Sequence, residues 1–224
     1  MNLGNLKTVA RKISPGGTTS RITNSLLELL LNEGAIHTAF LTAALKTNIY
    51  FGVTTDTSEY DITNIRSTFL RILPEGLWWN SGSSWTQLKP RTIKWLDDNR
   101  PGWRDADSSN PEFYYQHGDI LGVYPTPDTT LTNGFRLYLA ERGITMTQST
   151  HYPFHKKNDQ TTEISQFSIL SDSILDYYKW QVKKILSKNE QEIEMYRKVF
   201  AENAVMRKTV IESRLDISAD LREG

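Results

Sequence analysis

The chain has no cysteine, no long apolar run and no net charge. Without cysteine it can have no disulfide frame, no thiolate zinc site and no cysteine nucleophile. The longest apolar runs, residues 26–31 and 39–45, are far shorter than the roughly 20 apolar residues that span a bilayer, so we expect no membrane partner. The 26 basic and 26 acidic residues cancel, which excludes a long-range attraction to nucleic acid or to an anionic surface.

The chain has enough apolar residues for a folded core. Its 224 residues, 38% of them hydrophobic, are sufficient for one full core and a second small lobe. Six Trp and ten Tyr are a generous aromatic supply, which can serve either a core or an interface. Residues 1–14 lack the apolar centre of a secretion signal, so we expect a protein retained in the cell that makes it.

Helical patterns occupy the N-terminal part of the chain. Leu3, Leu6, Val9 and Ile13 predict a short amphipathic helix that ends at the Pro-Gly-Gly of residues 15–17. A second helix is predicted over residues 21–32, with an end or a kink at Gly34. The apolar segment 35–47 could form a third helix.

The C-terminal part is also helical in pattern. Apolar residues at helical spacing predict two helices between residues 165 and 213, with an interruption at Lys188 and Asn189. Residues 214–224 form a short amphipathic tail that we expect to dock on a partner.

Strand patterns fill the region between these helices. Short strands are predicted at residues 48–54, 59–62, 68–73 and 85–89. The stretch 114–143 alternates with a period of two on either side of a segment rich in proline, asparagine and glycine. We expect this stretch to form a hairpin of two strands, with no catalytic side chain on either.

Together these patterns predict an α+β fold, in which a helical bundle scaffold from both ends of the chain carries an inserted β-rich lobe. The predicted parts are N-terminal scaffold helices, the lobe, a polar loop, a C-terminal helix pair and a docking tail, at residues 1–47, 48–143, 144–164, 165–213 and 214–224.

Two groups of residues resemble metal sites. His151 and His155 are four residues apart with Asp159 nearby, but Pro153 lies between them, which favours a loop. The loop containing Asp105, Asp107, Ser109 and Asn110 offers the oxygen ligands of a calcium site. It lacks the glycine at the sixth position and the glutamate at the twelfth, so a polar loop is favoured.

Other catalytic patterns are incomplete. Asp97 and Asp98 could act as paired carboxylates, although a solvent-facing turn is the simpler interpretation. Gly16 and Gly17 precede a helix without the lysine of a phosphate loop, and Ser83 and Ser84 have no nucleophile setting. We therefore expect no enzyme activity, no cofactor and no metal.

Five tryptophans, Trp78, Trp79, Trp85, Trp95 and Trp103, lie within 26 positions, interleaved with Arg91, Lys94, Arg100 and Arg104. Such a set can stack on bases or sugar rings. It can also form a core together with an interface, where Trp and Arg are over-represented, and we favour this second interpretation.

The phrase Tyr-Pro-Thr-Pro-Asp at residues 124–128, followed by Leu-Tyr-Leu at 137–139, resembles the head-to-tail adaptor, or connector, proteins of tailed bacteriophages. The order of features is also similar over residues 20–212. It runs from a helix rich in Leu and Asn through a Tyr-Asp-Ile strand, a Trp-rich phrase and a proline-flanked aromatic patch to a final helix pair, at residues 22–32, 59–62, 88–95, 111–115 and 165–212.

The resemblance implies a structural virion protein, assembled in the host cytoplasm and located at the neck between capsid and tail. Such proteins form rings, usually of twelve copies, that contact the portal through the helices and tail, nozzle or fibre proteins through the other lobe. Double-stranded DNA passes through the ring without specific contacts.

By this analogy, the residues expected to dock on the portal are Leu215, Ile217 and Leu221. Those expected at the subunit or tail interface are Tyr124, Pro125, Pro127, Trp78, Trp79, Trp95 and Trp103. The alternative is a carbohydrate-binding or fibre-attachment module that uses the tryptophan cluster.

Overall fold

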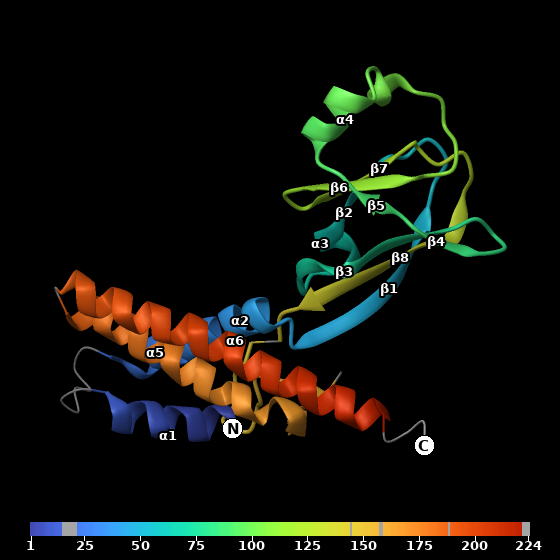
Figure 1. Cartoon of the computed structure of the whole chain (residues 1–224). Coiled ribbons are helices and arrows are strands. Elements are labelled where there is room, and N and C mark those ends of the chain that lie inside the picture. Colours follow the sequence, from blue (N-terminus) through green and yellow to red (C-terminus); the bar gives the residue numbers. More distant parts are fainter. Residues whose placement is uncertain (15–21, 144, 157–158, 188, 221–224) are drawn as a thin grey trace. The chain divides into compact units, whose positions relative to one another are not determined.

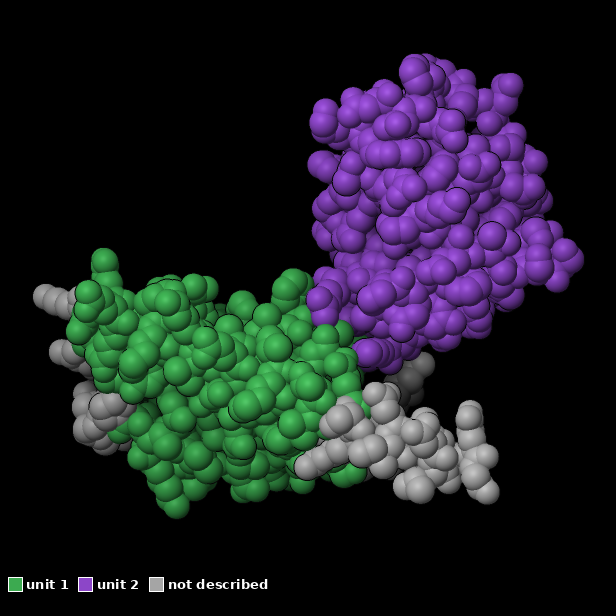
Figure 2. Space-filling view, viewed as in Figure 1, with its two compact units in different colours: residues 1–45, 142–224 green, residues 46–141 purple. Residues whose placement is uncertain are grey.

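The computed structural model describes residues 1–14, 22–143, 145–156, 159–187 and 189–220 (Figure 1). The fold is α+β, as the sequence predicts. The chain divides into two compact units, which Figure 2 shows in different colours. Unit 1 consists of residues 1–45 and 142–224, and unit 2 of residues 46–141.

Unit 1 contains four longer helices. They are α1 (Leu3–Ile13), α2 (Asn24–Thr42), α5 (Ser171–Leu186) and α6 (Glu190–Asp220). Helix α2 packs against the other three, and α5 packs against α6. A 3-10 helix η3 (Ser165–Leu170) and an antiparallel pair of short strands, β9 (His155–Lys156) and β10 (Asp159–Glu163), precede α5. The predicted interruption of the C-terminal helices is confirmed, because α5 ends at Leu186 and α6 begins at Glu190.

The prediction that a helix ends at Gly34 is wrong; the alternative of a kink there stays a prediction. Helix α2 continues through Gly34, which is buried against α5. A Cβ atom on Gly34 would lie 3.1 Å from Cγ2 of Ile174, so this glycine permits a close approach of the two helices. The helix ends at Thr42, where Ala43 takes a left-handed conformation with φ of 49°. The predicted third helix is therefore the second half of α2, followed by the start of a strand at Leu45.

A buried ion pair joins α5 to α6. The carboxylate of Asp176 accepts hydrogen bonds from Arg207 at 2.9 Å, Asn203 at 3.0 Å and Lys179 at 3.2 Å. The same guanidinium of Arg207 donates to Oγ of Ser173 at 2.9 Å. Charged groups this far from water need such partners, so the network sets how the two helices pair along their length.

Unit 2 is built from two four-stranded sheets. The first has the order β1-β8-β3-β4, from β1 (Leu45–Val53), β3 (Phe69–Asn80), β4 (Trp85–Gln87) and β8 (Leu131–Glu141). The second has the order β2-β7-β6-β5, from β2 (Glu59–Asp61), β5 (Lys89–Pro90), β6 (Phe113–His117) and β7 (Ile120–Tyr124). Their facing side chains form one apolar core, in which Leu77 and Phe135 of the first sheet meet Leu121 and Val123 of the second.

Three short helical segments complete unit 2. They are α3 (Ile62–Ile65), α4 (Ile93–Asn99) and the 3-10 helix η2 (Trp103–Asp105). Leu96 of α4 and Trp103 of η2 form a second, smaller core with Tyr115 of β6. The second sheet is therefore covered on both faces, by the first sheet on one and by α4 and η2 on the other.

The prediction that the two alternating strands of residues 114–143, β7 and β8, pair with each other as a hairpin is wrong. Both strands exist, and Phe135, Leu137 and Leu139 are buried as their alternation predicts. However, β7 pairs with β6 and β2, whereas β8 pairs with β3 in the other sheet. The proline-rich segment between them carries the chain from one sheet to the other. Backbone N–H groups hold it there, from Asp56 to the Pro127 carbonyl at 3.0 Å and from Ser109 to the Thr126 carbonyl at 2.7 Å.

Candidate functional site

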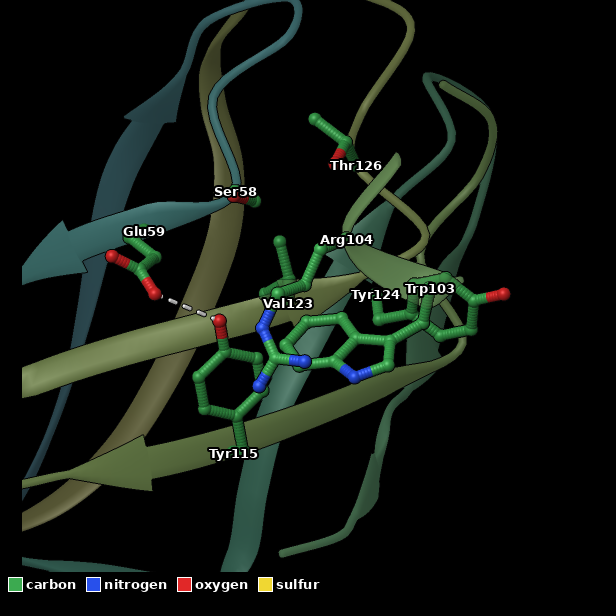
Figure 3. A pocket seen from close by; sticks show the side chains of 8 residues that line it. All are labelled: Ser58, Glu59, Trp103, Arg104, Tyr115, Val123, Tyr124 and Thr126. Atoms are coloured by element: carbon green, nitrogen blue, oxygen red, sulfur yellow. Dashed lines mark hydrogen bonds between the residues drawn. The ribbon is translucent and has the colours of Figure 1, made fainter. Parts of the chain in front are cut away.

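Unit 2 has a small cleft of about 90 Å³ on the face of the second sheet that η2 covers. Figure 3 shows its lining: Glu59 of β2, Tyr115 of β6, Val123 and Tyr124 of β7, Trp103 and Arg104 of η2, and Ser58 and Thr126. Two of these residues, Trp103 and Tyr124, belong to the interface predicted from the sequence. The cleft combines one carboxylate, one guanidinium and three aromatic rings.

The floor of the cleft depends on a glycine. Tyr115 and Gly122 are opposite each other on β6 and β7, and a Cβ on Gly122 would lie 2.0 Å from the Tyr115 ring. The ring therefore lies directly over the Gly122 backbone. Its hydroxyl donates to Oε1 of Glu59 at 2.9 Å, the bond drawn in Figure 3. Burial, and then the Glu59 carboxylate, raise the pKa of Tyr115 well above its usual value, which keeps it a hydrogen-bond donor.

The wall of the cleft is held by Asp97 of α4. Its Oδ1 accepts from Nε1 of Trp103 at 2.9 Å and from Nη1 of Arg104 at 2.7 Å. These two bonds, that of Trp103 first, lower the pKa of Asp97. The Arg104 guanidinium lies 4.4 Å from the centre of the Trp103 ring. Asp97 is therefore occupied with its neighbours, and it does not act with Asp98, which pairs with Lys94 at 3.3 Å.

Arginines also lie over three other tryptophans of the cluster. Arg91 lies 4.6 Å from the centre of the Trp95 ring. Arg136 lies 5.1 Å from Trp78 and 5.0 Å from Trp85. Stacking on a sugar or a base requires an open ring face, and in these four rings an arginine already occupies one. The arrangement therefore argues against the carbohydrate-binding alternative.

Trp79 differs from the other predicted interface residues. It is only 2% exposed, it packs against Phe135, and its Nε1 donates to Asn110 at 3.2 Å. A side chain this deep in the core cannot contact another protein. Its assignment to an interface is therefore wrong, because the alternation of β3 turns Trp79 inward and Trp78 outward.

The candidate metal sites do not come together. His151 and His155 are both buried, and Nδ1 of His151 accepts from the backbone N–H of Thr147 at 3.3 Å. In the part of the chain that the structure describes, no group of three His, Asp or Glu side chains could hold a metal ion. The loop around Asp105 and Asp107 is tied to the protein through Asn110, whose side-chain oxygen accepts from Nε1 of Trp79 at 3.2 Å.

The remaining catalytic candidates are the serine pair and the glycine pair. Ser83 and Ser84 belong to an exposed turn, where both hydroxyls contact that of Ser81 at 3.4 and 3.3 Å. Gly16 and Gly17 lie outside the described residues. Across the described ranges, no helix is long and apolar enough to cross a membrane.

The predicted docking residues fall at the end of the chain. Leu215 and Ile217 lie in the last part of α6, where the backbone alone is described, and Leu221 lies outside the described residues. Tyr124 and Pro125 are half-buried, with a cis peptide bond between them, and Pro127 is buried.

Two functional features were missed in the sequence. Glu59 and Tyr115 are 56 positions apart, and only the pairing of β2, β7 and β6 brings them together. Arg136 lies outside the tryptophan cluster in the sequence, yet its register opposite Trp78 places it among the rings. No local pattern could reveal either, because both depend on strand register.

The site has the rings and guanidinium groups typical of contacts between proteins. The class of protein to which the chain belongs follows from the comparison with known families. The chain belongs to the SU10 adaptor protein family, whose model matches residues 1–213. This is a family of bacteriophage adaptors, and it makes the chain a structural phage protein and a component of the virion. No curated protein matches the chain.

Proposed function

We propose that this protein is a head-to-tail adaptor, a subunit of a ring that lies between the portal and the tail and surrounds the DNA channel. The observation that carries the proposal is the family match over nearly the whole chain. A ring of identical subunits around an axis gives a continuous channel. The balanced charge of 26 basic and 26 acidic residues suits a channel through which DNA slides without tight binding.

In this proposal, the helices of unit 1 form the scaffold that docks on the portal. Helix α6 has 31 residues and is about 46 Å long, so it can present its C-terminal end far from its start. Leu215 and Ile217 near that end, together with Leu221, supply three apolar side chains for the portal surface. Twelve copies would bind, one for each portal subunit.

Unit 2, the inserted lobe, would present its arginine-covered rings to a neighbouring subunit or to tail, nozzle or fibre proteins. Arg91, Arg100 and Arg136 each lie within 6 Å of at least one ring centre. None of them forms an ion pair with another described residue. Arginines that are held in place and lack a carboxylate are ready to accept one from a partner. Trp78, Trp95, Tyr124 and Pro125, which are half-buried, supply the apolar part of this contact, and the buried Trp103 and Pro127 support them from beneath.

Co-sedimentation with the purified portal ring tests the proposal. The chain should pellet with the portal at low and at moderate salt. Trp78→Ala, which removes a half-buried ring at the surface of unit 2, should leave portal binding unchanged but weaken capture of the tail. A chain that stays in the supernatant at every portal concentration would contradict the proposal.

A further inference from the structure

The outer face of the first sheet of unit 2 carries an arginine among aromatic rings. Arg136 of β8 lies opposite Trp78 of β3, and Trp85 of β4 extends on the same side of the sheet. The guanidinium carbon of Arg136 is 5.1 Å from the centre of the Trp78 ring and 5.0 Å from that of Trp85. It is 5.2 Å from the centre of the Tyr138 ring. Tyr50 of β1 is 50% exposed and meets Trp85 edge-on, with ring centres 5.6 Å apart. We name these five residues the Arg136 patch.

The Arg136 patch is turned away from the core of unit 2. Successive side chains of a strand point to opposite faces, so Arg136 and Tyr138 lie on one face of β8 and Leu137 on the other. Leu137 belongs to the buried core, as does Trp79, which follows Trp78 on β3. The five residues of the patch come from all four strands of the sheet. Side chains on strands are held more precisely than side chains on loops, so the patch is a preformed surface.

The positive charge of Arg136 has no counter-charge in the described part of the chain. Arg136 forms no ion pair with any described residue. Its Nε is shielded from solvent and has no hydrogen-bond partner within the described ranges. The two Nη atoms also lack a partner among the described residues, but they are not shielded from solvent. The rings therefore hold the guanidinium from its sides and leave the outer edge of its fork accessible.

Two further hydrogen-bond donors lie beside this guanidinium. Nε1 of Trp85 and the hydroxyl of Tyr138 make no hydrogen bond to any residue that the structure describes, and neither atom is shielded from solvent. Trp78 differs, because its Nε1 donates to the backbone carbonyl of Glu75 at 2.8 Å. The patch thus combines a positive charge, N–H and O–H donors and apolar ring surface, and it contains no carboxylate. Such a set fits an anion, which a charged donor in poorly hydrated surroundings binds more strongly than in open water.

The anion that fits the patch best is a carboxylate on a protein. The planar fork of an arginine matches the two oxygens of a carboxylate through two parallel hydrogen bonds. The aromatic rings around Arg136 favour apolar side chains next to that carboxylate. Duplex DNA fits less well, because the patch has a single basic residue, whereas binding to the DNA backbone requires several phosphates to be neutralised together.

We propose that the Arg136 patch is the anchor site for an acidic side chain, flanked by apolar residues, on a protein partner. This inference rests on the proposed function, in which unit 2 contacts another protein, and it names the chemical group that the patch binds. Arg136 donates two hydrogen bonds to the carboxylate, and Trp85 donates a third. The rings of Tyr50 and Trp78 pack against the apolar neighbours of the acidic residue.

Two matched peptides test the site in nuclear magnetic resonance titrations of the whole chain. Acetyl-Leu-Glu-Leu-amide is the probe, and acetyl-Leu-Gln-Leu-amide has nearly the same shape without the charge. With ¹⁵N-labelled arginine and tryptophan, the Glu peptide should shift the Nε–H signal of Arg136 and the Nε1–H signal of Trp85. The signal of Trp79, which is buried in the core, should stay in place. The Glu peptide should bind at least about tenfold more tightly than the Gln peptide, and equal affinities would overturn the inference.

Three variants separate the contributions of charge, fork and ring. Arg136→Lys keeps the charge without the fork and should lose most of the preference for the Glu peptide. Trp85→Phe keeps a ring without its N–H and should weaken binding of the Glu peptide about two- to fivefold. Arg91→Lys is the matched control, because Arg91 also lies over a tryptophan, Trp95, but outside the patch, and it should leave peptide binding unchanged. The dispersion of the backbone amide signals verifies that each variant is folded.

Unchanged binding of the Glu peptide to Arg136→Lys would overturn the inference. A short DNA duplex that shifts the Arg136 signal when the Glu peptide does not would also overturn it, because the ligand would then be a phosphate. If the chain still pellets with the portal in either case, the proposed function stands and only this anchor site is wrong.

Discussion

The ion pair between Asp176 and Arg207 allows the packing of α5 on α6 to be tested by substitution. Asp176→Ala removes the carboxylate that accepts from Arg207, Asn203 and Lys179. Arg207 would keep only its bond to Ser173 among the described residues, with its side chain 15% exposed. An arginine left in that position loses its counter-charge while it remains largely shielded from water.

The expected loss of stability is large for one substitution. Breaking a fully buried pair costs about 3–5 kcal/mol, and the partial exposure of this pair places it at the low end, about 3 kcal/mol. In a chain of this size that corresponds to a fall of about 6–12 °C in melting temperature. Replacing both residues with leucine should cost much less than the sum of the two single changes, by at least about 2 kcal/mol.

Urea unfolding followed by far-ultraviolet circular dichroism measures these losses, since the helices of unit 1 dominate that signal. Lys208→Ala serves as the control. It removes a longer, more exposed pair with Glu212 at 3.7 Å and should cost less than about 0.5 kcal/mol. Single changes at Asp176 and Arg207 that each cost under about 1 kcal/mol, or that simply add, would refute the reasoning.

Three further predictions concern unit 2 and the C-terminal end. Gly122→Ala should cost about 1–3 kcal/mol in thermal unfolding, because its Cβ would displace the Tyr115 ring; an unchanged melting temperature would contradict this packing. Tyr60, with its pKa raised to about 12, and Tyr115 should stay protonated in an absorbance titration above pH 10, where unfolded tyrosines ionise. The raised pKa belongs to the folded state, so these two tyrosines contribute fully to stability below pH 10, and this contribution is lost as the pH rises further. In Tyr115→Phe, the fall in stability above pH 10 should therefore be smaller. Deletion of residues 214–224 should weaken portal binding at least about tenfold in biolayer interferometry, and an unchanged affinity would remove the docking assignment.

Local patterns in the sequence predict the helices well. The apolar spacing of α1 and the interruption between α5 and α6 are both visible, because amphipathic helices record their buried face every three or four residues. Gly34 was misinterpreted, because the sequence does not distinguish a glycine that ends a helix from one that lets two helices approach closely. Only the position of Ile174 on α5 separates the two cases.

Strand pairing is much less visible. The strands β7 and β8 alternate as expected and are separated by turn residues, yet they belong to different sheets. A short connection favours a hairpin, but here β7 pairs with β6 and β8 pairs with β3. The cleft depends on that arrangement, because Glu59, Trp103 and Tyr115 come from separate segments. Their residue types could be singled out from the sequence, but their proximity could not.

Mass photometry of the protein alone and mixed with the portal ring of its phage tests the central claim most directly. The adaptor account predicts a complex whose mass increases by close to one copy of the 25.7 kDa chain for each portal subunit. The complex should survive dilution and should leave no free portal when the chain is in excess. A chain that remains unbound, with the portal mass unchanged, would contradict the account.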